Sequence, residues 1–271
     1  MPHAPAAHRW HTLPAPSERR DPPMPDAPEN GEPSPAPGPA LVLRLRGSAE
    51  RAELSVRAAV FDCDGLLVDS ESIWLDMLSS WLAEYRVAAE AEEFLGLTVE
   101  DTAGSLALRL RDARPTDPAA RTAPLSTEQI RGALTARYSA RLAAGVEPMP
   151  GAWRLFSTLA ARIPVAVASN GLRRDVTAML TDSELLPLAQ AVCTVEDVAA
   201  GKPAPDLYLR ACEKLGVHPA DAVAFEDSPA GAQAAVSAGL VVVGVNPDPA
   251  VQLPAMHRLS SLDHVDPVLN P

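Results

Sequence analysis

The chain has 271 residues, enough for one large domain or two smaller ones, and 47% of them are hydrophobic. Its formal net charge of −12 argues against a nucleic-acid partner, and no apolar run reaches the length of about 18 residues that a membrane-spanning helix needs. Cys63, Cys193 and Cys212 lie far apart without a C-x-x-C spacing, which predicts reduced thiols and a cytoplasmic protein.

The first part of the chain is rich in proline and shows no hydrophobic period. It includes Pro22-Pro23 and the proline run at 33–39, and it offers few side chains that a core would bury. This composition predicts a disordered tail, and no apolar segment typical of a secretory signal follows the start. Residues 41–46 alternate like an edge strand or belong equally well to the tail. We assign residues 1–54 to the tail.

A short apolar run at 58–61 predicts a buried strand that ends in two carboxylates, Asp62 and Asp64, followed by Gly65. Residues i and i+2 of an extended chain lie on the same side, so both carboxylates are expected to face one pocket. Two carboxylates at this spacing repel each other unless a cation lies between them. The pattern favours a divalent metal site with a nucleophile beside a proton carrier, although a polar turn at a strand end has the same composition.

Helical periodicity follows this motif. Apolar residues recur at helical spacing from 73 to 85, with Ser70 as the expected N-cap. Thr98 and Ser126 are expected to begin two further helices, which extend to about residues 110 and 144. No strand signal interrupts this stretch, so residues 73–146 are predicted to form an all-helical block.

Predicted helices and short apolar strands alternate from residue 151 onward. This alternation predicts an α/β fold with a doubly wound, Rossmann-like parallel sheet covered by helices on both faces. The helical block interrupts the pattern after the first strand. We therefore expect a catalytic core made of residues 55–72 and 147–271, with residues 73–146 inserted as an all-helical cap domain.

Polar residues follow three of the predicted strands, at the sheet edge where open parallel sheets bind ligands. They are Asp62 with Asp64, Ser169 with Asn170, and Glu226 with Asp227. Ser169 and Ser228 each precede a helix, whose free N–H groups attract phosphate oxygens. Simple capping explains each serine alone, and a solvated turn explains Glu226-Asp227 alone. The joint placement favours a binding site.

Lys202 lies in a stiff loop between Gly201 and Pro205. The only other lysine in this arginine-rich chain is Lys214. A solvated loop lysine is the simpler interpretation, but the neighbouring polar clusters favour a site that needs a compact ammonium group.

Four segments together resemble the motifs of the haloacid dehalogenase superfamily, most closely its helical-cap phosphatases of the beta-phosphoglucomutase-like subgroup. The segments are residues 61–65, 168–170, 201–203 and 225–228. The resemblance covers residues 57 to about 265.

The resemblance implies a Mg²⁺-dependent phosphatase that hydrolyses a small phosphorylated metabolite, such as a sugar phosphate or a similar phosphomonoester, through an aspartyl-phosphate intermediate. It implies Asp62 as the nucleophile and Asp64 as the general acid and base. It assigns phosphate binding to Ser169, Asn170 and Lys202, with Lys202 also offsetting the charge of the nucleophile. The implied Mg²⁺ site consists of Asp62, Asp64 through its carbonyl, Asp227, and Glu226 as a ligand or a supporting group.

Two alternatives stay open. A beta-phosphoglucomutase-like sugar-phosphate mutase uses the same motifs, although such mutases carry an arginine for the second phosphate of the substrate where this chain has Val99. A non-enzymatic member would bind a partner through its tail and cap, and the complete residue set argues against it. We expect a monomeric enzyme that acts on a small phosphorylated molecule, with no nucleic-acid or membrane partner.

Overall fold

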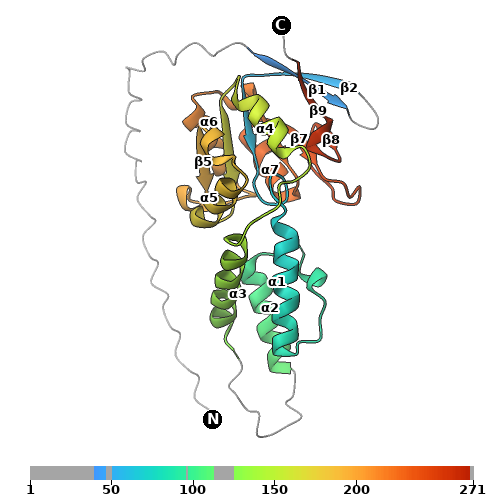
Figure 1. The fold of residues 1–271 in the computed structure, drawn as a ribbon, viewed down its shortest axis with the longest axis vertical. Helices are drawn as coiled ribbons and strands as arrows, with labels where there is room; N and C mark the ends of the chain where they lie inside the picture. Colours follow the sequence, from blue (N-terminus) through green and yellow to red (C-terminus); the bar gives the residue numbers. More distant parts are fainter. Residues whose placement is uncertain (1–39, 47–50, 96, 113–124, 269–271) are drawn as a thin grey trace, which may run out of the picture. The chain divides into compact units, whose positions relative to one another are not determined.

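The computed structural model describes residues 40–46, 51–95, 97–112 and 125–268 (Figure 1). Its centre is a parallel sheet with the strand order β5-β4-β3-β6-β7-β8. The strands are β3 (Ala58–Phe61), β4 (Val165–Ser169), β5 (Ala191–Thr194), β6 (Ala222–Glu226), β7 (Val241–Val245) and β8 (His257–Leu259). Because β3 lies in the middle, the chain winds first to one side and then to the other, which confirms the predicted doubly wound α/β fold.

Helices cover both faces of this sheet. The helices α4 (Ala152–Ala160) and α5 (Arg173–Asp182) pack on one face. The helices α6 (Asp206–Leu215) and α7 (Pro229–Ala238) pack on the other. Short 3-10 segments join these elements: η3 (Leu186–Leu188), η4 (Val195–Asp197), η5 (Pro219–Asp221) and η6 (Leu262–His264). No helix in the described ranges is long and apolar enough to cross a bilayer.

The two faces of the sheet differ in side-chain size, which explains how an alanine-rich chain builds a core. Phe61 and Phe225 at the ends of β3 and β6 belong to the face under α4 and α5, and their rings stack with centroids 4.7 Å apart. The ring of Phe156 in α4 packs against the ring of Phe61, with the ring centroids 5.0 Å apart. The alternate strand positions, such as Ala58 and Ala224, belong to the face under α6 and α7. The period of two along each strand therefore separates a bulky layer from a small one.

The inserted block contains α1 (Ser70–Tyr85), η1 (Ala91–Phe94), α2 (Val99–Asp112) and α3 (Thr127–Leu142). These elements share a separate core around Trp81 and Phe94. The predicted N-cap of α1 is wrong by one residue, because Asp69 accepts the N–H of Ser72 at 3.1 Å. Only helices occur in the described part of residues 73–146.

A second sheet of three antiparallel strands has the order β2-β1-β9 and consists of β1 (Leu41–Arg46), β2 (Arg51–Val56) and β9 (Val265–Val268). The predicted tail of residues 1–54 is therefore wrong in its last part, while residues 1–39 lie outside the described residues. Leu43 and Leu45 are buried in the same cluster as Val265 and α4. β1 pairs with β2, which follows it in the chain, and with β9, which lies more than two hundred residues away. The local alternation alone does not reveal the distant pairing, and so it does not separate β1 from a tail.

We expect Leu45→Ala to lower the free energy of unfolding by about 2–5 kcal/mol, because truncating a buried leucine leaves a cavity. Leu45 is 2% exposed. The matched control is Arg44→Ala on the solvent side of the same strand, where the pairing with Glu53 is exposed and is expected to contribute little. Urea denaturation measures both values. Equal, small losses for the two variants would show that β1 is not packed on the core.

Candidate active site

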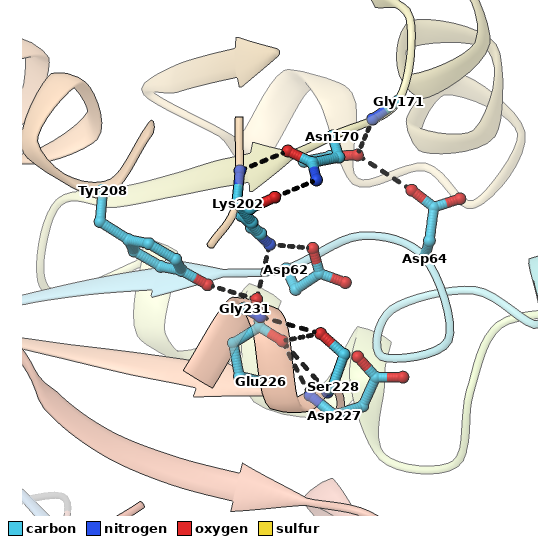
Figure 2. A network of polar contacts seen from close by, with 11 residues as sticks. Asp62, Asp64, Asn170, Gly171, Lys202, Tyr208, Glu226, Asp227, Ser228 and Gly231 are labelled. Carbon is cyan, nitrogen blue, oxygen red and sulfur yellow. Dashed lines mark hydrogen bonds and ion pairs between the residues drawn. The ribbon is translucent and has the colours of Figure 1, made fainter. Parts of the chain in front are cut away.

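The polar residues predicted at the sheet edge meet at the carboxyl ends of β3, β4 and β6 (Figure 2). Asp62 directly follows β3, while Ser169 and Glu226 are the last residues of β4 and β6. The Asp62 N–H donates to the carbonyl of Phe225 at 3.0 Å, which extends the pairing of β3 and β6 into the site. Parallel pairing of adjacent strands therefore places side chains from distant motifs side by side.

Lys202 lies between two carboxylates at the centre of this arrangement. Its Nζ forms ion pairs with Oδ1 of Asp62 and with Oε1 of Glu226, the latter at 2.6 Å. The three side chains are between 0% and 9% exposed, so water screens these charges poorly. The loop before α6 thus brings a single buried ammonium group to the ends of β3 and β6.

The site has more negative charge than Lys202 can balance. Burial raises the pKa of Asp62 to about 8, with Lys202 lowering the pKa and the charges of Glu226 and Asp64 raising it further. Burial, followed by the charges of Asp62 and Glu226, raises the pKa of Asp227 well above its usual range. Burial alone lowers the pKa of Lys202, but Asp62 and Glu226 outweigh it and raise that pKa. A bound cation would relieve this excess of negative charge.

Glu226 is fully buried and both of its carboxylate oxygens are engaged. Its Oε1 accepts from Lys202 Nζ and from the Tyr208 hydroxyl at 2.7 Å. Its Oε2 accepts from the N–H of Asp227 at 3.1 Å and from the N–H and hydroxyl of Ser228 at 3.3 and 3.1 Å. Glu226 therefore fixes Lys202 and the start of α7, and this geometry favours the supporting role over direct metal ligation.

Gly231 in α7 makes this arrangement possible. A Cβ at this position would lie 1.8 Å from Oε1 of Glu226, so any side chain would displace the carboxylate. The Gly231 N–H donates to Ser228 Oγ at 3.1 Å, which confirms Ser228 as the N-cap of α7. The first turn of α7 thus packs directly on Glu226.

Asp62, Glu226 and Asp227 each offer a carboxylate oxygen, and these oxygens lie within 4.8 Å of one another. Oδ1 of Asp227 is buried without a hydrogen-bond partner. An unpartnered buried carboxylate oxygen within an all-oxygen donor set fits a hard cation such as Mg²⁺. Gly65 leaves room for Asp227, because a Cβ there would lie 2.4 Å from Asp227 Oδ2.

The carboxylate of Asp64, the fourth predicted metal residue, does not belong to that cluster. Its Oδ2 accepts from the Ser169 hydroxyl at 2.9 Å, and Ser169 Oγ accepts from the Gly171 N–H at 2.8 Å. Ser169 is not a helix cap, since Leu172 holds that position for α5. Ser169 therefore orients the side chain of Asp64 in this structure.

The side chain of Asn170 is used to hold the Lys202 loop. Its Nδ2 donates to the Lys202 carbonyl at 3.1 Å, and its Oδ1 accepts from the Lys202 N–H at 2.8 Å. This pair of bonds fixes the backbone on which the Lys202 ammonium group depends. The structure therefore gives the Asn170 side-chain amide a positioning role, and the phosphate binding that the resemblance implies for Asn170 stays a prediction.

Tyr208 and Asn246 contribute to the site but were not predicted from the sequence. Tyr208 lies on the buried face of α6, and its ring centroid is 5.2 Å from Lys202 Nζ. Asn246 follows β7 and donates to the carbonyl of Asp227 at 3.0 Å. In the sequence, the features that could have indicated these two residues are a tyrosine within the apolar stripe of α6 and an asparagine directly after a strand. Both are too common to single out a site.

We expect Tyr208→Phe to lower the free energy of unfolding by about 1.5–3 kcal/mol, because Glu226 loses a buried hydrogen bond to a charged acceptor. Tyr85→Phe in the cap is the matched control, since its ring stacks on Trp81 far from Glu226. Urea denaturation compares the two variants. A loss for Tyr208→Phe no larger than that of the control would remove the Tyr208 hydroxyl from the supporting network.

Known proteins are similar to this chain in both sequence and fold. The family model of haloacid dehalogenase-like hydrolases matches residues 56–239. A validoxylamine A 7'-phosphate phosphatase from Streptomyces hygroscopicus subsp. limoneus is 31% identical over 195 residues, which cover 70% of this chain and 85% of that protein. A beta-phosphoglucomutase from Mycobacterium bovis is 34% identical over 238 residues, covering 77% of this chain and 86% of that one.

A similar solved structure is that of a CbbY mutant from Rhodobacter sphaeroides in complex with xylulose 1,5-bisphosphate. It aligns with a TM-score of 0.60 and 28% sequence identity, covering 76% of this chain and 95% of that chain. The family match begins at residue 56, the last residue of β2. Strand β1 and nearly all of β2 therefore lie outside the matched range.

Proposed function

This chain belongs to the haloacid dehalogenase-like hydrolase family, and from that premise we propose that it is a Mg²⁺-dependent phosphatase of small phosphomonoesters. The observation that carries the proposal is the contact of Lys202 with Asp62 and Glu226 beside the unpartnered oxygen of Asp227. Phosphoryl transfer depends on positioning and charge compensation, which this arrangement supplies. The similarity to a validoxylamine A 7'-phosphate phosphatase supports the same reaction class.

In the first half of the reaction, a carboxylate oxygen of Asp62 attacks phosphorus and the bond from phosphorus to the leaving oxygen breaks. Asp64 donates a proton to that oxygen, so the alcohol departs neutral. In the second half, Asp64 accepts a proton from a water molecule that attacks the aspartyl phosphate. The bond between Asp62 and phosphorus breaks, which releases inorganic phosphate and restores the carboxylate.

The remaining residues hold these groups in place. Lys202 fixes the orientation of the Asp62 carboxylate, and Ser169 fixes that of Asp64. When bound to Asp62, Asp227 and the carbonyl of Asp64, Mg²⁺ would neutralise charge between the phosphate and these carboxylates. The cavity of about 190 Å³ lined by Asp62, Asp64, Lys202 and the first turn of α7 is the proposed place for the phosphoryl group.

A sugar-phosphate mutase is the second candidate, favoured by the 34% identity to a beta-phosphoglucomutase. A mutase must bind a phosphate at each end of its substrate. In this chain Val99 lines the cavity between the helical block and the sheet edge, and valine cannot pair with a phosphate. Incubation with a beta-hexose 1-phosphate separates the two, because a phosphatase releases inorganic phosphate and a mutase releases an isomer.

The function is tested with the purified full chain and a panel of small phosphomonoesters, with release of inorganic phosphate as the readout. We expect release in the presence of Mg²⁺ and its loss with EDTA. Failure to release phosphate from any member of the panel, or release unaffected by EDTA, would contradict the proposal. We also propose a cytoplasmic protein, because all three cysteines are buried free thiols. The further proposal that the chain is a monomer is tested by size-exclusion chromatography.

A further inference from the structure

Two cavities adjoin the proposed phosphate site. One has a volume of about 300 Å³ and the other about 790 Å³. Both are lined by Gly65 and Asp227 from the sheet edge, by Glu71 from α1 and by Leu95, which follows η1. Because the two cavities share these residues, we treat them as one space and name it the cap cleft. A leaving group attached to a phosphate at Asp62 would occupy the cap cleft.

The charged side chains that line the cap cleft all have the same sign. They are Asp64, Glu71, Asp227 and Asp248. Among the described residues, no lysine, arginine or histidine lines either cavity. Even when Mg²⁺ neutralises Asp227 and Asp64 carries the proton of the general acid, the carboxylates of Glu71 and Asp248 remain. Among the described residues, the cap cleft therefore offers no cationic partner to a second anionic group on the substrate.

Four arginines of the inserted block already pair with acidic groups of the same block. The pairs are Arg109 with Glu93, Arg131 with Glu128, Arg137 with Glu84, and Arg141 with Asp76. These pairs draw the four guanidinium groups to carboxylates outside the cap cleft, since neither member of any pair lines its cavities. The block is rich in arginine, yet none of these cations serves the cleft.

Beside uncharged polar residues such as Asn246 and Ser260, the wall of the cap cleft contains a group of apolar and aromatic side chains. Leu95 and Leu97 are large side chains that are 42% and 45% exposed, and both line the cleft with Val99. The rings of Trp74 and Tyr138 meet edge to face with centroids 5.3 Å apart. The Tyr138 hydroxyl donates to the Ser70 carbonyl at 3.3 Å. The Tyr138 ring therefore lines the cleft beside Trp74, while its only polar side-chain group already has a hydrogen-bond partner.

We propose that the cap cleft selects phosphomonoesters whose leaving group carries no second negative charge and presents an apolar or ring face, with Trp74 and Val99 as the residues that set this preference. This inference rests on the proposed phosphatase function. A carboxylate or second phosphate in the cleft would lose water and face carboxylates without a cation. A ring face would instead cover Trp74 and the exposed leucines, and the removal of apolar surface from water would favour binding.

The test compares two matched pairs of substrates with the full chain and Mg²⁺. The first pair is glycerol 3-phosphate and 3-phosphoglycerate, and the second is phenyl phosphate and 4-carboxyphenyl phosphate. We expect kcat/KM to be at least about tenfold higher for the member of each pair that lacks the carboxylate. A site that offers an anion no cationic partner discriminates against that anion by a factor of this order.

Two variants address the residues that set the preference. Val99→Arg is expected to shift the kcat/KM ratio of each pair toward the carboxylated member by about tenfold, because it supplies the missing cation. Its control is Leu108→Arg, on the same helix but 60% exposed and outside both cavities. Trp74→Ala is expected to raise KM several-fold for phenyl phosphate and little for glycerol 3-phosphate, and it tests the wall independently of whether Val99→Arg folds.

The outcomes separate this inference from the function on which it rests. Equal efficiency for both members of each pair, or a preference for the carboxylated members, overturns the inference and leaves the phosphatase function in place. No release of phosphate from any substrate overturns both. An equal shift for Val99→Arg and Leu108→Arg would show that general surface charge, not the cap cleft, sets the preference.

Discussion

Asp62→Asn is expected to lower the rate of phosphate release by about four orders of magnitude or more, while the fold stays intact. The amide has the shape of the carboxylate but lacks its nucleophilicity, and removing a nucleophile eliminates the step on which the later steps depend. Lys202 keeps its ion pair with Glu226 in the variant, so the buried ammonium group is not left alone. Inorganic phosphate release measures the rate, and circular dichroism with thermal melting checks the fold.

The matched control for Asp62→Asn is Asp266→Asn, which removes the same charge from β9, where Asp266 forms an exposed ion pair with Arg46 outside the cap cleft and the three-carboxylate cluster. We expect this variant to keep most of the activity of the unmodified chain. Retention of more than about one per cent of activity in Asp62→Asn would remove Asp62 from the nucleophile role, because that loss corresponds to less than about 3 kcal/mol of activation free energy. An inactive Asp266→Asn would instead indicate that the loss of any negative charge disables the enzyme.

The sheet and the location of the site were predictable because both depend on local patterns. Apolar runs followed by Asp62, Ser169 and Glu226 indicate strands that end in polar residues, and parallel pairing brings such ends to one edge. The order β4-β3-β6 at the centre of the sheet then places the three residues together. The sequence pattern therefore predicts these positions but not the contacts between their atoms.

The individual contacts were not predictable, because they depend on residues brought together by packing. The side-chain amide of Asn170 bonds the backbone of Lys202, thirty-two positions away, and no local pattern indicates that contact. Tyr208 joins the site only because α6 places its hydroxyl at Glu226. Strand β1 is not distinguished from a tail for the same reason, since one of its two partner strands, β9, lies at the other end of the chain.

Binding of Mg²⁺ is expected to stabilise the folded chain by about 2.7 kcal/mol at one hundred times its dissociation constant, because the ion binds the folded state alone. Asp227→Asn should remove most of this gain, since the unpartnered Oδ1 of Asp227 belongs to the proposed ligand set. Asp248→Asn should keep the gain. Thermal melts of the three proteins with EDTA and with Mg²⁺ provide the measurement.

The pH dependence of the same melts in EDTA gives an independent check. Burial and the neighbouring acids raise the pKa of Asp227, so its carboxyl binds a proton more tightly in the folded than in the unfolded state. Asp62 behaves likewise, with its folded pKa raised to about 8. The stability of the metal-free protein should therefore fall as pH rises from about 4 toward about 8, because the folded state must ionise groups that the unfolded chain ionises more easily.

Asp227→Asn should weaken that fall and be more stable than the unmodified chain in EDTA at neutral pH, while being less stabilised by Mg²⁺. The two effects have opposite signs because the same carboxylate repels Asp62 and Glu226 without a cation and binds the cation when it is present. A merely destabilising substitution would lower stability under both conditions. Equal Mg²⁺ shifts in Asp227→Asn and the unmodified chain would remove Asp227 from the metal site, and the cation would then have to be held by Asp62 and Asp64 without the carboxylate that follows β6.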